Sequence, residues 1–84
     1  MNIAAMIHET DRRFAAGEVT FLYAQAIRSL DKLIPDARLA FESGRLGRAN
    51  AYALAKKSPE QQAALLEDAM TMMTAAFIPY CNGS

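Results

Sequence analysis

Apolar residues recur at three- and four-residue intervals along most of the chain, which is the spacing of one face of an α-helix. The clearest run covers four turns and consists of Val19, Leu22, Tyr23, Ala26, Ile27, Leu30, Leu33 and Ile34. A second run of the same period consists of Ile3, Met6, Ile7, Thr10 and Phe14. No run of valine or isoleucine suggests a strand. The pattern therefore predicts an all-α protein.

Glycine and proline divide this pattern into separate helices. Gly17 and Gly44 are expected to end helices, because glycine adopts the left-handed conformation freely. Pro35 suits the first turn of a short helix, and Ser58 to Gln61 has the sequence of a capping box. We expect Pro79 to end the last helix. These signals predict one compact domain, residues 1–84, with about five helices at approximately 3–16, 19–34, 36–43, 47–57 and 59–77.

The composition bears on assembly. The chain has 84 residues, of which 52% are hydrophobic. A chain this short buries only about 60% of the surface of its unfolded state, so its stability margin is small. Association with further copies would bury more apolar surface. We therefore expect a homo-oligomer, with the second helix or the region from Met70 to Phe77 in its seam.

Charge is balanced overall but not locally. Nine basic and nine acidic residues give a net charge of zero, which argues against a protein held to nucleic acid mainly by bulk electrostatics. Residues 38–57 nevertheless carry five basic residues against one acidic residue. Arg45, Arg48, Lys56 and Lys57 are therefore candidate contacts for phosphates or for an acidic protein partner.

The sequence offers little for catalysis, so we predict that the protein is not an enzyme and needs no cofactor. His8 is expected to be a surface residue, without the neighbours that a general base requires. No cluster has the spacing of a metal site. The single cysteine, Cys81, falls in an expected loose tail and indicates a reducing compartment. No segment reads as a signal peptide or a membrane span, which favours a cytoplasmic protein.

The methionines near the end of the chain allow two interpretations. Met70 and Met73 lie close to Phe77 in the sequence. Methionine adapts its shape easily, so these residues could line a groove for a protein partner. They could equally form part of the core or a dimer seam, which is the interpretation that we favour because small domains rarely leave apolar surface uncovered.

Residues 29–62 resemble the helical segment that follows the helix-turn-helix of ParB-type partition proteins. The similarity lies in Leu33 to Ala37, Phe41 to Leu46, Ala49 to Ala55 and Ser58 to Gln62. The resemblance implies that the segment just upstream, from Thr20 to Leu33, occupies the position of a DNA-recognition helix. Within it, Gln25 and Arg28 are the side chains best suited to base edges.

Two functions remain open from the sequence. The first is a non-catalytic interaction module, a small regulator or inhibitor from a phage, plasmid or integrated element that binds a protein partner. The second is a DNA-binding regulator with a ParB-like helical core. Global neutrality favours the first, because it weakens the phosphate contribution that dominates non-specific DNA affinity.

Overall fold

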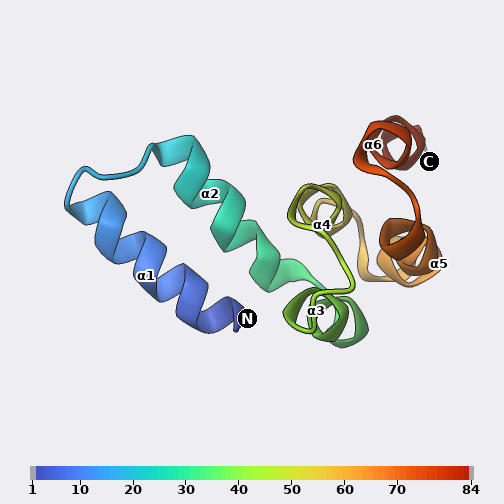
Figure 1. Ribbon diagram of the computed structural model, residues 1–84, viewed down its shortest axis with the longest axis horizontal. Helices are drawn as coiled ribbons and strands as arrows, with labels where there is room; N and C mark the ends of the chain where they lie inside the picture. The colour runs from blue at the N-terminus through green and yellow to red at the C-terminus, as the bar shows by residue number, and fades with distance from the viewer. Residues whose placement is uncertain (1, 84) are drawn as a thin grey trace.

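The computed structural model describes residues 2–83 and confirms the all-α class. The chain is 77% helical, with no strand in the described part. Figure 1 shows the order of the elements. They are α1 (Ile3–Ala15), α2 (Phe21–Ser29), a 3-10 turn η1 (Leu30–Lys32), α3 (Pro35–Glu42), α4 (Arg48–Ala55), α5 (Pro59–Thr71) and α6 (Thr74–Asn82). Over residues 2–83, no helix has both the length and the apolar character needed to cross a membrane.

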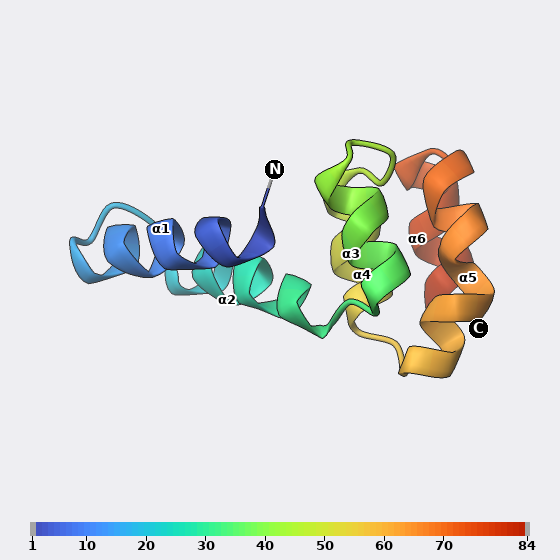
Figure 2. The same cartoon turned by 90° about the horizontal axis from the view of Figure 1, so that it is seen from below.

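The helices form two groups that cross each other. Helices α1 and α2 lie side by side and antiparallel, as a hairpin whose connecting turn is one end of the molecule (Figure 1). Helices α3 to α6 run roughly perpendicular to this hairpin and pack together at the other end (Figure 2). The molecule is consequently elongated, measuring 37 × 22 × 21 Å. The turn between α1 and α2 is left as a free end.

The core lies mainly among helices α3 to α6, and the hairpin and η1 add Ile3 and Leu30 to it. Its most completely buried large side chains come from α1, η1, α4 and α6, and they are Ile3, Leu30, Leu54 and Phe77. The backbone N–H of Ile3 donates to Glu42 Oε2 of α3 at 2.7 Å, which places a carboxylate at the positive end of α1. Each group of helices therefore supplies part of one continuous core.

Several of the predicted start and stop signals lie at helix ends. Gly17 and Gly44 both have positive φ, at 76° and 85°, in the turns that follow α1 and α3. A side chain at either position would strain the backbone. Pro35 opens α3. The capping box before α5 is complete, because Ser58 and Gln61 each bond the backbone N–H of the other.

Helix α2 is shorter than the helix predicted at residues 19–34 from the run of apolar residues. Helix α2 begins at Phe21 because Thr20 caps it, accepting a hydrogen bond from the backbone N–H of Tyr23 at 3.1 Å. Ile27 and Leu30 are buried as predicted, but Leu22 is 77% exposed. The apolar run from residue 19 to 23 covers too wide an arc of the helix for every member to face inward.

The prediction of five helices is wrong, because the last one is divided in two. Helix α5 ends at Thr71, and Met72 and Met73 are extended, with ψ angles of 144° and 151°. Helix α6 then runs through Pro79, which was expected to end a helix. A proline inside a helix costs about 3 kcal/mol. Burial of Phe77 on the same helix offsets this cost.

The expected loose tail is also wrong. Cys81 is fully buried on α6, and its thiol donates a weak hydrogen bond to the carbonyl oxygen of Ala53 at 3.8 Å. The end of the chain therefore packs against α4. Because the thiol is inaccessible in the folded protein, it does not provide a reactive cysteine.

The position of Leu30 leads to a first prediction. Leu30 is fully buried, whereas Leu39 on α3 is 60% exposed. We expect Leu30→Ala to lower the free energy of unfolding by about 2–5 kcal/mol, because it leaves a cavity in the core. Leu39→Ala is the matched control and should change it by less than about 0.5 kcal/mol. Urea denaturation followed by circular dichroism measures both, and equal losses would contradict the assignment of Leu30 to the core.

Candidate functional site

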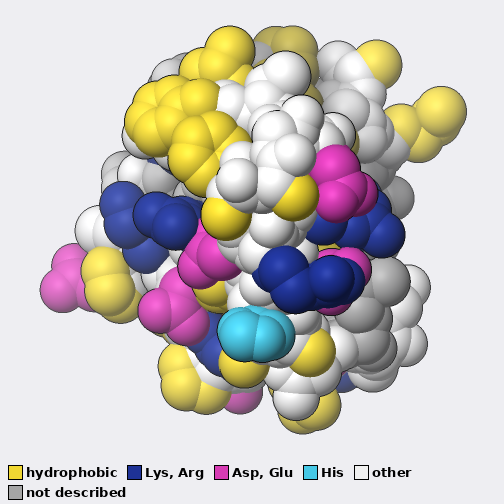
Figure 3. Space-filling model, turned by 90° about the vertical axis from the view of Figure 1, so that its left-hand side faces the viewer, with side chains coloured by type: hydrophobic (Ala, Val, Ile, Leu, Met, Phe, Trp, Pro, Cys, Tyr) yellow, Lys and Arg dark blue, Asp and Glu magenta, His cyan; other side chains and the backbone are white. Residues whose placement is uncertain are grey.

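Two exposed aromatic side chains lie together at the free end of the hairpin. Phe14 of α1 is 40% exposed and Phe21 of α2 is 58% exposed. Their ring centroids are 6.0 Å apart, with an angle of 50° between the ring planes. We call this pair the aromatic edge. Seen from this end of the molecule, hydrophobic side chains gather beside a band of mixed basic and acidic groups (Figure 3).

The charged groups of the hairpin neutralise one another. Glu9 accepts hydrogen bonds from Arg12 and Arg13, the shortest of them 2.7 Å long. The hydrogen bond from Arg12 lowers the pKa of Glu9 below its ordinary value. On the other side, Arg28 of α2 pairs with Asp11 of α1 at 2.7 Å. The hairpin that carries the aromatic edge therefore presents ion pairs rather than a field of one sign.

The predicted basic residues of segment 38–57 do not meet on one surface. Arg45 and Arg48 lie before and at the first turn of α4, whereas Lys56 and Lys57 follow its last residue. An eight-residue helix separates the two pairs by about 12 Å. Arg45 donates to Ser43 Oγ at 3.1 Å and faces α5. At one end of α4, Arg45 lies toward α5 and Arg48 toward the hairpin, and the two lysines follow the other end of the helix.

Gln25 and Lys56 are brought together, although they lie 31 positions apart in the sequence. They line a hollow of about 370 Å³ between α2 and α4. Its other lining residues are Leu22, Ala26, Ser29 and Tyr52. Arg28 does not line this hollow, because it pairs with Asp11 on the α1 side of α2. Of the two residues proposed to read bases, only Gln25 therefore lines the hollow.

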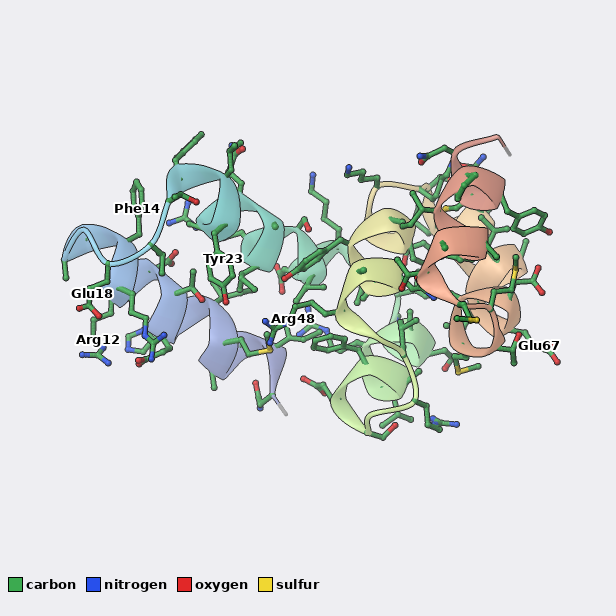
Figure 4. All side chains as sticks on the ribbon, turned by 45° about the horizontal axis from the view of Figure 1, so that its top comes forward. Arg12, Phe14, Glu18, Tyr23, Arg48 and Glu67 are labelled. Carbon is green, nitrogen blue, oxygen red and sulfur yellow. The ribbon has the colours of Figure 1, made fainter. Side chains whose placement is uncertain are left out.

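Arg48 faces the hairpin. It reaches from α4 toward Tyr23 of α2 (Figure 4), and both line a hollow of about 180 Å³. No ion pair involves Arg48 among residues 2–83. Arg13 and Glu9 line the same hollow. This cation is available to a ligand or partner, but an acidic side chain stands beside it.

The three residues predicted for an oligomer or partner interface do not lie on one surface. Phe77 is fully buried in the core of this chain. Met70 is half-buried and lines a hollow with Leu39 and Arg45. Met73 is 80% exposed, at the junction of α5 and α6. Phe77 therefore belongs to the core of the chain. Of the three residues, only Met73 projects into solvent.

Two buried amides that the sequence reasoning did not single out hold the helices in place. Gln62 on α5 is 1% exposed and makes three hydrogen bonds to the backbone of other segments. Asn50 on α4 is 5% exposed and donates to the carbonyl oxygens of Ala69 and Met72 at 3.0 Å each. Periodicity does not reveal such residues, because a buried amide looks like a surface residue in a sequence pattern.

The hydroxyl of Tyr52 is a buried polar group without a partner. No hydrogen bond to it is found within the described part of the chain. Burial raises the pKa of Tyr52 above its ordinary value, and Arg48 partly opposes that shift. The phenol therefore stays neutral at physiological pH and serves as part of the wall between α2 and α4.

The described residues contain no group of three or more His, Cys, Asp or Glu side chains that could hold a metal ion. Comparison with protein families, with curated proteins and with solved structures finds no match for this chain.

Proposed function

We propose that this protein is a non-catalytic helical interaction module, a small regulator or inhibitor of the kind carried by phages and plasmids. It acts by binding a protein partner. The observation that carries the proposal is the aromatic edge, where Phe14 and Phe21 remain exposed at the free end of the hairpin. Aromatic residues are enriched at the centres of protein interfaces, because they bury a large area at a small cost in conformational entropy.

The surroundings of the aromatic edge support a protein partner over a nucleic acid. Glu9 and Asp11 of the same hairpin are each paired with arginines, so these charges neutralise one another. A hydrophobic centre with a polar rim is the usual anatomy of a protein interface. A surface that binds phosphates instead presents unpaired cations. The net charge of zero agrees with this preference.

The proposal predicts site-specific photo-crosslinking to a partner. A benzoylphenylalanine placed at Phe21 should give a discrete adduct in a bacterial host lysate, heavier than twice the 9.2 kDa chain. The same group at Tyr80 is the matched control, because Tyr80 is an exposed aromatic residue on α6, 48% accessible. Adding Phe14→Asp to the Phe21 variant should abolish the adduct, since it places a charge in the apolar centre.

Two results would contradict the proposal. One is an adduct pattern that is the same at Phe21 and at Tyr80. The other is a salt-dependent shift of random duplex DNA at micromolar protein, which would favour the alternative of a DNA-binding regulator with a ParB-like core. In that alternative the unpaired Arg48 and Lys56 contact phosphates, together with Arg45 and Lys57, and Gln25 or Arg28 reaches the bases.

We also propose a cytoplasmic location and a homo-oligomeric state. The buried free thiol of Cys81 fits a reducing compartment. The apolar fraction of 52% is high for so short a chain, and further copies would cover exposed apolar groups such as Leu22.

A further inference from the structure

The hollow of about 180 Å³ that Arg48 and Tyr23 line, which we call the Arg48 hollow, contains a polar group that the fold does not use. Thr10 of α1 also lines this hollow and is only 6% exposed. Its hydroxyl makes no hydrogen bond within residues 2–83, yet it is not sealed from solvent as the hydroxyl of Tyr52 is. It therefore opens into the hollow. Folded proteins satisfy nearly all such groups, so an unused hydroxyl at this depth points to a ligand.

Arg48 is also without a partner, and its position in the helix is unfavourable. It makes no ion pair within residues 2–83. It is the first residue of α4, and the residue before it, Gly47, provides no capping side chain. The N-terminus of a helix carries partial positive charge, so a cation there is destabilising. An anion bound to Arg48 would remove this cost and would be attracted by both charges.

The charges that line the Arg48 hollow indicate a ligand with a single negative charge. Two arginines, Arg13 and Arg48, line it together with one acidic residue, Glu9, which leaves one positive charge in excess. Glu9 accepts hydrogen bonds from Arg12 and Arg13, and the bond from Arg12 lowers its pKa. The charge of Glu9 is therefore already compensated. One excess positive charge matches a carboxylate better than a phosphate dianion.

The rest of the lining and the size of the Arg48 hollow indicate a short apolar body. Met6 of α1 and Ile27 of α2 complete the lining. At about 30 Å³ for each water molecule, the hollow has room for about six waters, and hence for a ligand with about six non-hydrogen atoms. An aliphatic chain of that length would displace water from the two apolar side chains, which is favourable.

We propose that the Arg48 hollow is a binding site for a small organic carboxylate. The guanidinium of Arg48 donates two parallel hydrogen bonds to the carboxylate, as arginine does at many carboxylate sites. The hydroxyl of Thr10 donates a third, and the aliphatic chain lies on the apolar lining. The ligand contacts α1, α2 and α4 at once, so it ties the hairpin to the other helices. Neither residue of the aromatic edge lines the hollow, which makes this a second site, separate from the proposed partner site.

Titration with butyrate, which matches the expected size, tests the site directly. Nuclear magnetic resonance of the ¹⁵N-labelled chain should give a dissociation constant on the order of 1 mM, as expected for so small a ligand. The largest shifts should be those of the Arg48 Nε–H and the Thr10 backbone N–H. Butanol lacks the charge and inorganic phosphate lacks the chain, so each should bind at least about fivefold more weakly at the same ionic strength. Phosphate binding tighter than butyrate would overturn the carboxylate assignment.

Substitutions identify the groups that hold the carboxylate. Arg48→Gln should weaken butyrate binding about tenfold or more. Lys56→Gln is the matched control and should leave it unchanged, because Lys56 is an exposed cation at the other end of α4 and does not line the hollow. Thr10→Val keeps the shape but removes the hydroxyl and should weaken binding about threefold, whereas Thr10→Ser should retain it. Equal effects of Arg48→Gln and Lys56→Gln would show general charge attraction and would rule the site out.

Thermal unfolding separates ligand binding from a role in the fold. Without butyrate, Arg48→Gln and Thr10→Val should unfold at a temperature at least as high as the unsubstituted chain, because neither group has a partner to lose. Butyrate at about ten times its dissociation constant should raise the midpoint of the unsubstituted chain by about 5–10 °C over the same concentration of sodium chloride. The rise for Arg48→Gln should be less than about 3 °C. Lower midpoints for both variants without butyrate, and no rise with it, would contradict the proposal.

Two further outcomes assign Arg48 to the functions proposed above instead. If butyrate does not bind and Arg48→Gln abolishes the photo-crosslinked adduct at Phe21, Arg48 belongs to the protein interface and the carboxylate site is overturned. If butyrate does not bind and Arg48→Gln abolishes a shift of duplex DNA, Arg48 contacts phosphates and the site is equally overturned. An adduct at Phe21 that persists in Arg48→Gln, together with the loss of butyrate binding, supports two separate sites.

Discussion

Replacing Gln62 with leucine should lower the free energy of unfolding by about 3–5 kcal/mol, although leucine is apolar, close in size and buried at the same place. The side chain of Gln62 accepts a hydrogen bond from the backbone N–H of Ile34 at 2.8 Å. It donates to the carbonyl oxygens of Lys32 and Lys57 at 3.0 Å each. Leucine satisfies none of these groups. The chain would lose its link between η1, the start of α3 and the turn before α5.

The neighbouring Gln61 provides the control. It is exposed and contributes only to the capping box with Ser58. Gln61→Ala should therefore cost about 0.5–1 kcal/mol. Chemical denaturation of both variants, with unchanged slopes against denaturant, gives the comparison. A loss below 1 kcal/mol for Gln62→Leu would mean that the three backbone groups find water instead, and that Gln62 does not join the segments.

The parts of the fold that the sequence predicted depend on local physical chemistry. Pro35 fixes its own backbone angle, Gly44 tolerates positive φ, and Ser58 caps the helix that it precedes. Each effect operates within a few residues and requires no knowledge of the tertiary fold. The inward positions of Ile27 and Leu30 also follow from helical spacing alone.

The parts that the sequence did not predict depend on residues that are distant in the chain. The break at Met72 has no glycine or proline beside it, and a tertiary hydrogen bond from Asn50 provides the partner that a helix end requires. Helix α6 likewise tolerates Pro79 because Phe77 and Cys81 are buried against other helices. Packing energy here overrides local propensity, as it commonly does in small domains.

On the candidate surfaces, too, local features could be predicted from the sequence, but contacts between distant residues could not. The spacing placed Gln25 on the outer face of a helix, but it gave no indication that Lys56 stands beside it across the hollow. Arg28 was named as suited to base edges, yet it pairs with Asp11, 17 residues earlier. The adjacent apolar residues Phe21 and Leu22 were a usable signal, because two neighbours about 100° apart on a short helix cannot both face one core.

The second large effect is expected at Asn50, where Asn50→Asp should lower the free energy of unfolding by about 3–5 kcal/mol at pH 7. The Nδ2 group of Asn50 donates to the carbonyl oxygens of Ala69 and Met72 at 3.0 Å each. An ionised carboxylate has no proton to donate and would face two carbonyl oxygens in a buried site. Helix α5 would lose the partner for its last carbonyl groups, and the turn into α6 would lose its support.

The loss at Asn50→Asp should depend on pH in a defined direction. Burial beside two carbonyl oxygens raises the folded-state pKa of the new carboxyl above its unfolded value of about 3.9. The destabilisation is therefore smallest below about pH 4, where the protonated acid donates to one carbonyl, and it grows as the pH rises through the folded-state pKa. Asn82→Asp, on the exposed end of α6, is the isosteric control and should show no such dependence. Equal pH profiles for the two variants would indicate that Asn50 does not hold the end of α5, and that the division between α5 and α6 has another cause.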